Sequence, residues 1–100
     1  MTTDKIFQLI KSHHGLTLKQ IQSQSRKEDL VYARRTITNL MSKQNCSINA
    51  IAAKINRDRC TIIRYLKTNS DEWLYNPKFR CFFDAVCLTT LKLEIENNEN

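Results

Sequence analysis

The sequence predicts an all-α fold, a compact bundle of about six helices that contains a helix-turn-helix. Two observations carry this prediction. The chain has one glycine and one proline in 100 residues, and its apolar residues recur at helical spacing in several separate stretches. One hundred residues suit one domain with a single core. We expect that domain over residues 1–96 and a disordered polar tail over residues 97–100.

Three helices are expected in the first half of the chain. Thr2 or Thr3 can cap the first, which ends at Gly15, and Thr17 can cap a short second helix. Ser25, with Glu28 three residues later, forms a capping-box pattern that would open a third and longer helix, running to about residue 43. The apolar stripe of this long helix consists of Leu30, Ala33, Ile37, Leu40 and Met41.

Four cations accompany the long helix. Arg26 and Lys27 would lie at its start, held at the domain edge, where they could grip a phosphate backbone or enter a minor groove. Arg34 and Arg35 fall beside the apolar stripe. Ordinary surface cations on a capped helix are an equally good interpretation of Arg26 and Lys27.

The helix-turn-helix is predicted over residues 47–66. Ser47 can cap its first helix, and free backbone amides there could meet a phosphate. Asn56 and Arg57 interrupt an apolar pattern that then resumes, so two helices share one apolar seam. That seam consists of Ile48, Ile51, Ala52, Ile55, Ile62, Ile63 and Leu66. Many all-helical domains pack two short helices this way without touching nucleic acid.

The second helix of this pair carries a cationic outer face that would fit a major groove. The face consists of Arg57, Arg59, Thr61 and Arg64. Asp58 is interpreted first as the helix cap or as an ion-pair partner of Arg57, and second as an acceptor for a cytosine amino group. We expect this helix to end near residues 67–69 and a short turn to follow from Ser70.

A last helix is predicted to start at Asn76-Pro77 and to run to Leu93 or Ile95. Its apolar residues are spread around much of the helix and are Phe79, Phe82, Phe83, Val86, Leu88 and Leu91. They could pack across the preceding helices or form a dimer interface.

Charge is distributed unevenly along the chain. Residues 1–70 carry thirteen Lys or Arg against four acids, a net of +9, and residues 71–100 carry three against six, a net of −3. The basic segment therefore indicates a polyanionic partner, although a merely soluble basic protein is also possible.

Several classes of function are disfavoured. Cys46, Cys60, Cys81 and Cys87 form no CxxC pair, and the adjacent His13 and His14 offer no zinc spacing, so we expect no metal and no cofactor. No catalytic constellation or Gly-rich phosphate loop is present, so we expect no enzyme. No long apolar run suggests a membrane segment, and we expect a cytoplasmic location with reduced thiols. Cys81 and Cys87 are expected in the core.

Taken together, these residues resemble the C-terminal DNA-binding domain of the bacterial replication initiator DnaA, which has a Trp-repressor-like helix-turn-helix. The resemblance covers about residues 6–95. It rests on Arg26 followed by Ala33-Arg34, on Ser47 with Ile51, and on the run Arg57-Asp58-Arg59-Cys60-Thr61-Ile62, where the family has Arg-Asp-His-Thr-Thr-Val. Arg59 and Cys60 depart from the family at base-facing positions, and the nucleotide-binding motif GxxxxGK[ST] is absent.

The resemblance implies a role for each matching residue. Arg26 would enter the minor groove, while Asp58 and Thr61 would work at base edges in the major groove. Phosphate contacts would come from Arg34, Ser47 and Arg57. The candidate DNA-binding residues are therefore Arg26, Lys27, Arg34, Arg35, Ser47, Arg57, Asp58, Arg59, Cys60, Thr61 and Arg64.

The function that we predict is sequence-specific binding of double-stranded DNA, in replication initiation or transcription regulation and without an ATPase part. Two alternatives stay open. One is a protein-interaction module that uses the aromatic last helix, with a second copy or a replication or transcription protein as its partner. The other is a transposase or sigma-type domain that binds DNA ends or promoters.

Overall fold

The computed structural model describes residues 3–98 of the chain and the side chains of residues 3–89. Within these residues all regular structure is helical, which confirms the predicted all-α class. Six helices follow one another: α1 (Thr3–His14), α2 (Leu18–Ile21), α3 (Glu28–Lys43), α4 (Ile48–Ile55), α5 (Arg59–Tyr75) and α6 (Pro77–Asn98).

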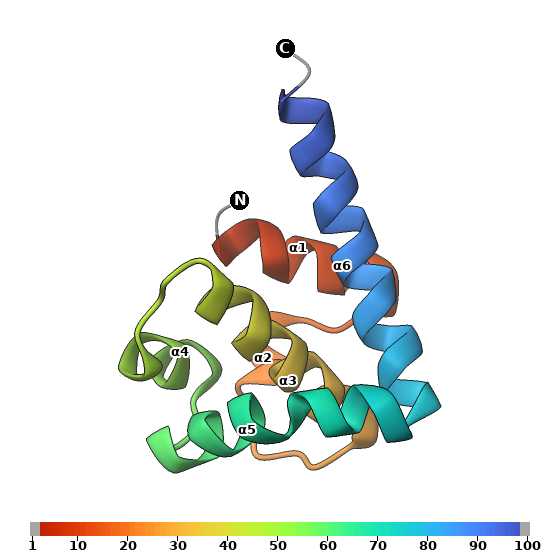
Figure 1. Cartoon of the computed structure of the whole chain (residues 1–100). Helices are drawn as coiled ribbons and strands as arrows, with labels where there is room; N and C mark the ends of the chain where they lie inside the picture. The colour runs from red at the N-terminus through yellow and green to blue at the C-terminus, as the bar shows by residue number, and fades with distance from the viewer. Residues whose placement is uncertain (1–2, 99–100) are drawn as a thin grey trace.

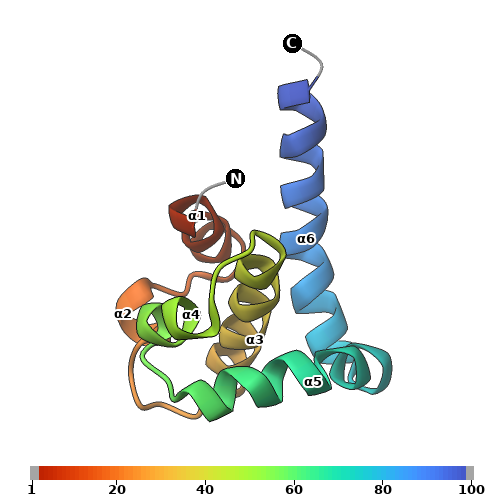
Figure 2. The same ribbon diagram turned by 60° about the vertical axis from the view of Figure 1, so that its left-hand side comes forward.

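Helix α3 is the centre of the bundle, and each of the other five helices contacts it. Figure 1 shows α5 running beneath α3 and α6 rising beside it, while α1 crosses above. Figure 2 shows α2 beside α4, on the side of α3 away from α6. One face of α3 is lined by the predicted stripe, and all five of its residues are buried: Leu30, Ala33, Ile37, Leu40 and Met41.

Short-range signals in the sequence set several helix boundaries correctly. The Thr17 hydroxyl accepts from the backbone N–H of Gln20, whose side chain accepts from the backbone N–H of Thr17. Ser47 caps α4 by accepting from the N–H of Ala50. Gly15 ends α1 in the left-handed region, with φ +69°. Pro77 opens α6, and the Asn76 side chain accepts from the N–H of Phe79.

The predicted capping box at Ser25 is wrong. Helix α3 begins at Glu28, three residues after Ser25, and its N-cap residue is Lys27, which makes no side-chain capping bond. The backbone carbonyl of Ser25 is instead occupied by the side chain of Arg34. Residues 22–27 therefore form a loop, which we call the α2–α3 loop, and Arg26 and Lys27 lie in it rather than in a helix.

The predicted break near residue 68 is also wrong, because α5 continues without interruption to Tyr75. Asn69 sits inside the bundle, only 7% exposed, and forms two hydrogen bonds with Arg35 of α3. An asparagine whose amide is satisfied across the helix pair no longer competes with the helix backbone. The helix that follows the turn is thus long enough to join the helix-turn-helix to α6.

Helix α6 uses its aromatic residues inside the molecule. Phe79, Phe82 and Val86 are buried, whereas Leu88 is 65% exposed. The predicted end of this helix is too early, since α6 reaches Asn98 and extends beyond the other helices (Figure 1). The predicted tail therefore begins inside α6. Residues 99 and 100, and the side chain of Leu91, lie outside the described part.

Cys81 lies in surroundings that differ from the predicted ones, and His14 contacts an aromatic residue of α6. Cys81 is exposed, while Cys87 is partly buried against the core and burial raises the pKa of its thiol to about 11. His14 is not a free surface residue, because its ring stacks on Phe82 with centroids 3.7 Å apart. Its Nε2 atom is buried without a hydrogen-bond partner.

Candidate nucleic-acid interface

The turn between α4 and α5 fixes how the two helices cross. Asn56 adopts the left-handed conformation, φ 54° and ψ 54°, and the N–H of Arg57 bonds back to the carbonyl of Ala52 at 3.0 Å. This conformation ends α4 and redirects the chain into α5. The two helices then pack through side chains that are fully buried, namely Ile51, Ile55 and Ile62.

The outer face of α5 carries exposed cations at its N-terminal end. Ile62 and Tyr65 are buried, so the side of the helix opposite them faces outward. Arg59, Arg64 and Lys67 are exposed, and Cys60 is exposed with them. We did not predict Lys67 as a site residue, because the helix was expected to end there. Its spacing, three residues after Arg64 and seven after Cys60, is the sequence signal that places it on this face.

Asp58 stands at the start of α5 but does not cap it with its side chain. Its backbone carbonyl accepts from the N–H groups of Thr61 and Ile62, whereas its carboxylate makes no capping hydrogen bond. Asp58 is therefore the N-cap residue of α5, as predicted, but its side chain makes no capping hydrogen bond. The Asp58 side chain is exposed next to Arg59, while Thr61 is half-buried.

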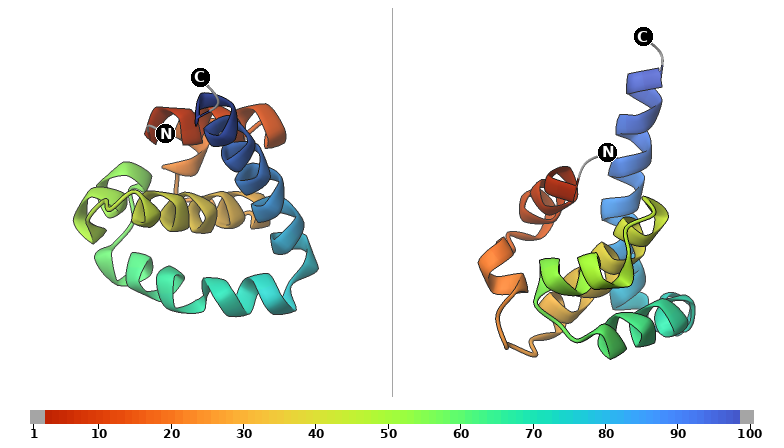
Figure 3. Two further views of the ribbon diagram at one scale, coloured as in Figure 1. Left: turned by 45° about the horizontal axis from the view of Figure 1, so that its top comes forward. Right: turned by 90° about the vertical axis from the view of Figure 1, so that its left-hand side faces the viewer.

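The α2–α3 loop lies beside the beginning of α5. Figures 2 and 3 show the loop descending from α2 and passing close to the start of α5 before it joins α3. Arg26 and Lys27 are both exposed in this loop. The loop thus begins beside the start of α5, where Arg57 binds the carbonyl of Ser23, and it ends at Glu28, which borders a pocket with Pro77 and Lys78 of α6.

Arg34 was expected to contact phosphate, and the structure contradicts this. Its side chain is 1% exposed, and its guanidinium donates to four backbone carbonyls of α2 and the α2–α3 loop. Those acceptors are Gln20, Ile21, Ser23 and Ser25, and the shortest donor–acceptor distances are 2.8 Å. A buried guanidinium whose donors are bound to carbonyls cannot reach a duplex. Arg34 instead holds the loop in place from inside the domain.

Arg35 of α3, also predicted to bind DNA, points toward α5 inside the bundle. Its Nη1 atom donates to the side chains of Thr68 and Asn69 at 2.9 and 3.0 Å, and its guanidinium carbon lies 4.8 Å from the Tyr65 ring centroid. Arg35 therefore joins α3 to the middle of α5. This role accounts for its position beside the apolar stripe of α3.

Arg57 lies in the turn before α5, not on the outer face of the helix as predicted. Its guanidinium donates to the carbonyls of Asn56, at 2.8 Å, and Ser23, at 2.6 Å. The side chain is half-buried between the turn and the α2–α3 loop. Arg57 therefore connects the two cationic segments, and its implied phosphate contact stays a prediction.

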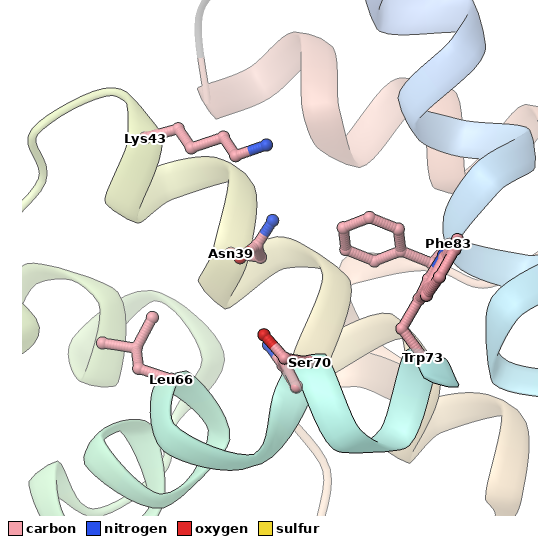
Figure 4. Close-up of a pocket in the computed structure, with 7 residues that line it drawn as sticks. Asn39, Lys43, Leu66, Ser70, Trp73 and Phe83 are labelled. Atoms are coloured by element: carbon pink, nitrogen blue, oxygen red, sulfur yellow. The ribbon is translucent and has the colours of Figure 1, made fainter. Parts of the chain in front are cut away.

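A cavity of about 290 Å³ opens on another side of the bundle, where α3, α5 and α6 meet. Figure 4 shows Lys43 and Asn39 of α3 facing Ser70, Trp73 and Phe83 across it. Leu66 and Asn69 complete its lining. The cavity is bordered by the C-terminal part of α5, so it is separate from the exposed cations Arg59 and Arg64.

This geometry defines the class of protein: an all-helical domain with a helix-turn-helix whose second helix presents an exposed cationic face. Residues 3–68 match the family described as the bacterial dnaA protein helix-turn-helix. Since the match covers more than half of the chain, the protein belongs to this family, whose domain is a non-catalytic DNA-binding module. No curated protein and no solved structure matches the chain.

Two further findings concern other kinds of site. Among the residues that the structure describes, no group of His, Cys, Asp and Glu side chains is arranged to hold a metal ion. Over the same residues, no helix is both long and apolar enough to span a membrane.

Proposed function

We propose that this chain binds double-stranded DNA at a preferred sequence, as a regulator of replication initiation or of transcription. The observation that carries the proposal is a pair of exposed cationic segments, of which the loop is joined to the turn before α5 by the hydrogen bond from Arg57 to Ser23. The outer face of α5 contributes Arg59, Arg64 and Lys67, and the α2–α3 loop contributes Arg26 and Lys27. An α-helix fits the major groove, and a basic segment beside it reaches the adjacent minor groove.

Each exposed group has a proposed task. Arg59 and Cys60 reach base edges from the first turn of α5, and Asp58 accepts from a cytosine amino group, because its carboxylate is not used by the helix. Arg26 enters the minor groove. Lys27, Arg64 and Lys67 neutralise phosphates. Ser47 contacts a phosphate at the start of α4, where its hydroxyl already caps the helix.

Selection of duplexes from a random pool tests the preference for a sequence. The dissociation constants of the selected duplex and of a random duplex are then compared for the wild type and for Arg59→Ala. We expect the affinity of the variant for the selected duplex to fall by about fivefold to 150-fold, from 1–3 kcal/mol of base contact, and its affinity for the random duplex to change little. Lys78→Ala, an exposed charge loss on α6, is the matched control. Equal losses for Arg59→Ala on both duplexes would contradict base reading.

The salt dependence tests the phosphate contacts separately. The logarithm of the binding constant should fall with the logarithm of salt concentration, with a slope of roughly −0.9 for each neutralised phosphate. A slope close to zero would remove the electrostatic part of the proposal. Arg34 is buried and makes no direct contact with phosphate in this proposal, so Arg34→Ala should leave the slope of the salt dependence unchanged.

A further inference from the structure

We infer that Gln22 and Asn56 form a latch that fixes the α2–α3 loop to the turn of the helix-turn-helix, so that Arg26 and α5 meet DNA as one rigid unit. This inference deepens the proposed function and rests on it. Two hydrogen bonds run in opposite directions across the junction. The Gln22 Nε2 atom donates to the carbonyl of Lys54 at 2.8 Å, and the Asn56 Nδ2 atom donates to the carbonyl of Gln22 at 3.1 Å.

Asn56 does more in this turn than its backbone conformation requires. Its φ of 54° is in the left-handed region, where glycine is the least strained residue and asparagine is tolerated. Glycine would make the same turn but would supply no side-chain donor. The Asn56 amide reaches Gln22, 34 residues earlier in the chain, so this side chain ties two segments that the sequence keeps far apart.

Two guanidinium groups also bind backbone carbonyls of the α2–α3 loop. The carbonyl of Ser23 accepts from Arg34, at 3.0 Å, and from Arg57, at 2.6 Å. Arg34 also holds the carbonyl of Ser25, the residue directly before Arg26. Because the donors of a guanidinium keep a fixed planar geometry, they fix the carbonyls that they bind. The backbone that carries Arg26 is therefore anchored up to the preceding residue.

This anchoring matters because Arg26 and α5 would contact the same duplex. A loop that moved independently would have to be ordered when it bound, which weakens binding by the entropy of ordering. With the loop fixed at the right spacing, the second contact is made at high effective concentration once the first has formed. Gln22, Asn56 and Arg34 are thus positioning residues that act through Arg26.

A double-mutant cycle tests this role. The latch variant combines Gln22→Ala with Asn56→Gly, which removes both hydrogen bonds and keeps a residue that tolerates the turn. Gln24→Ala, in the same loop and exposed, is the control. Binding to the duplex selected by the wild type is measured with Arg26 and with Arg26→Ala in each background. Circular dichroism checks that every variant is folded.

We expect Arg26→Ala to weaken the wild type and the Gln24→Ala control by about tenfold, as for one charge-assisted contact. In the latch variant the loss should be smaller, about threefold, because Arg34 and Arg57 still hold the carbonyls of Ser23 and Ser25. Amide exchange at Ser25 should be faster in the latch variant. The same factor in all three backgrounds would overturn the latch, and so would no effect of Arg26→Ala in the wild type. If the wild type does not prefer the selected duplex, the proposed function itself fails.

Discussion

The two ends of α5 differ in what their side chains and backbone contact, although they belong to one continuous helix. The cationic end, Arg59 to Lys67, presents exposed cations on its outer face. The anchor end, Asn69 to Tyr75, is tied to its neighbours. Asn69 pairs with Arg35 of α3, and Arg80 of α6 donates to the carbonyls of Trp73 and Leu74 at 2.9 and 2.6 Å.

This difference shows how the domain can present charge without losing rigidity. Like charges on a free helix end would repel one another and gain little from the fold. The anchor end contributes hydrogen bonds to α3 and α6, including a bond of 2.8 Å from the Trp73 indole N–H to Asp84 of α6. Binding and stability should therefore respond to mutations at different ends of the same helix, which can be tested directly.

The largest effect is expected from reversing charge at the cationic end. Arg59→Glu combined with Arg64→Glu should weaken binding to a random duplex by at least about a hundredfold, because two attractions become repulsions. Fluorescence anisotropy measures the affinity, and circular dichroism should show an unchanged melting temperature. Lys11→Glu with Lys78→Glu, exposed positions on α1 and α6, makes the same change in net charge. An equal loss in this control would show that only net charge matters.

A smaller effect of the opposite kind is expected at the anchor end. Asn69→Ala removes both hydrogen bonds between Asn69 and Arg35. The backbone carbonyl of Arg35 then loses the Asn69 amide as its donor. The free energy of unfolding, measured with urea, should fall by about 1–3 kcal/mol. DNA affinity, measured where the variant is still folded, should change by less than about twofold. Ser70→Ala, at the exposed neighbouring position, should change neither quantity. A large loss of affinity in folded Asn69→Ala would mean that the two ends are not independent.

The smallest effect concerns pH and lies away from α5. Burial lowers the pKa of His14, and the nearby His13 lowers it further, while the backbone of Phe82 and Asp29 act in the opposite direction. The folded protein therefore binds fewer protons at this site than the unfolded chain. The contribution of His14 to the free energy of unfolding is present above about pH 6.5, the pKa of an unperturbed histidine. It is lost as the pH falls toward the lower pKa that His14 has in the folded protein.

His14→Phe should remove this part of the acid sensitivity and keep a ring against Phe82. Urea unfolding at a series of pH values between about 5 and 8 measures the difference between the variant and the wild type. Identical pH profiles for the two proteins would contradict the prediction. Binding to DNA at pH 7 should be the same for both.

Local signals in the sequence predicted much of the fold. Thr17, Ser47 and Asn76-Pro77 act within three or four residues, so their effect could be predicted without knowledge of the tertiary structure. The apolar stripe of α3 was found by periodicity and is buried as expected. The family assignment depended on the same region of the chain.

The errors came from side chains that are satisfied across long separations. Ser25 looked like a cap, but Arg34 binds its carbonyl from nine residues away. Asn69 looked like a helix breaker, but its amide is used by Arg35, 34 residues earlier. Arg34 itself looked like a surface cation, because charge and spacing do not reveal that four carbonyls surround it. Lys67 was missed as a consequence of the error at Asn69.

The four backbone carbonyls that accept hydrogen bonds from Arg34 limit how the α2–α3 loop could be transferred to another protein. Transplanting only Arg26 and Lys27 onto another scaffold would transfer their charge without the geometry that presents it. A working graft would need Arg34, Gln22 and Asn56 as a set, together with a helix placed like α3 to bring the guanidinium underneath.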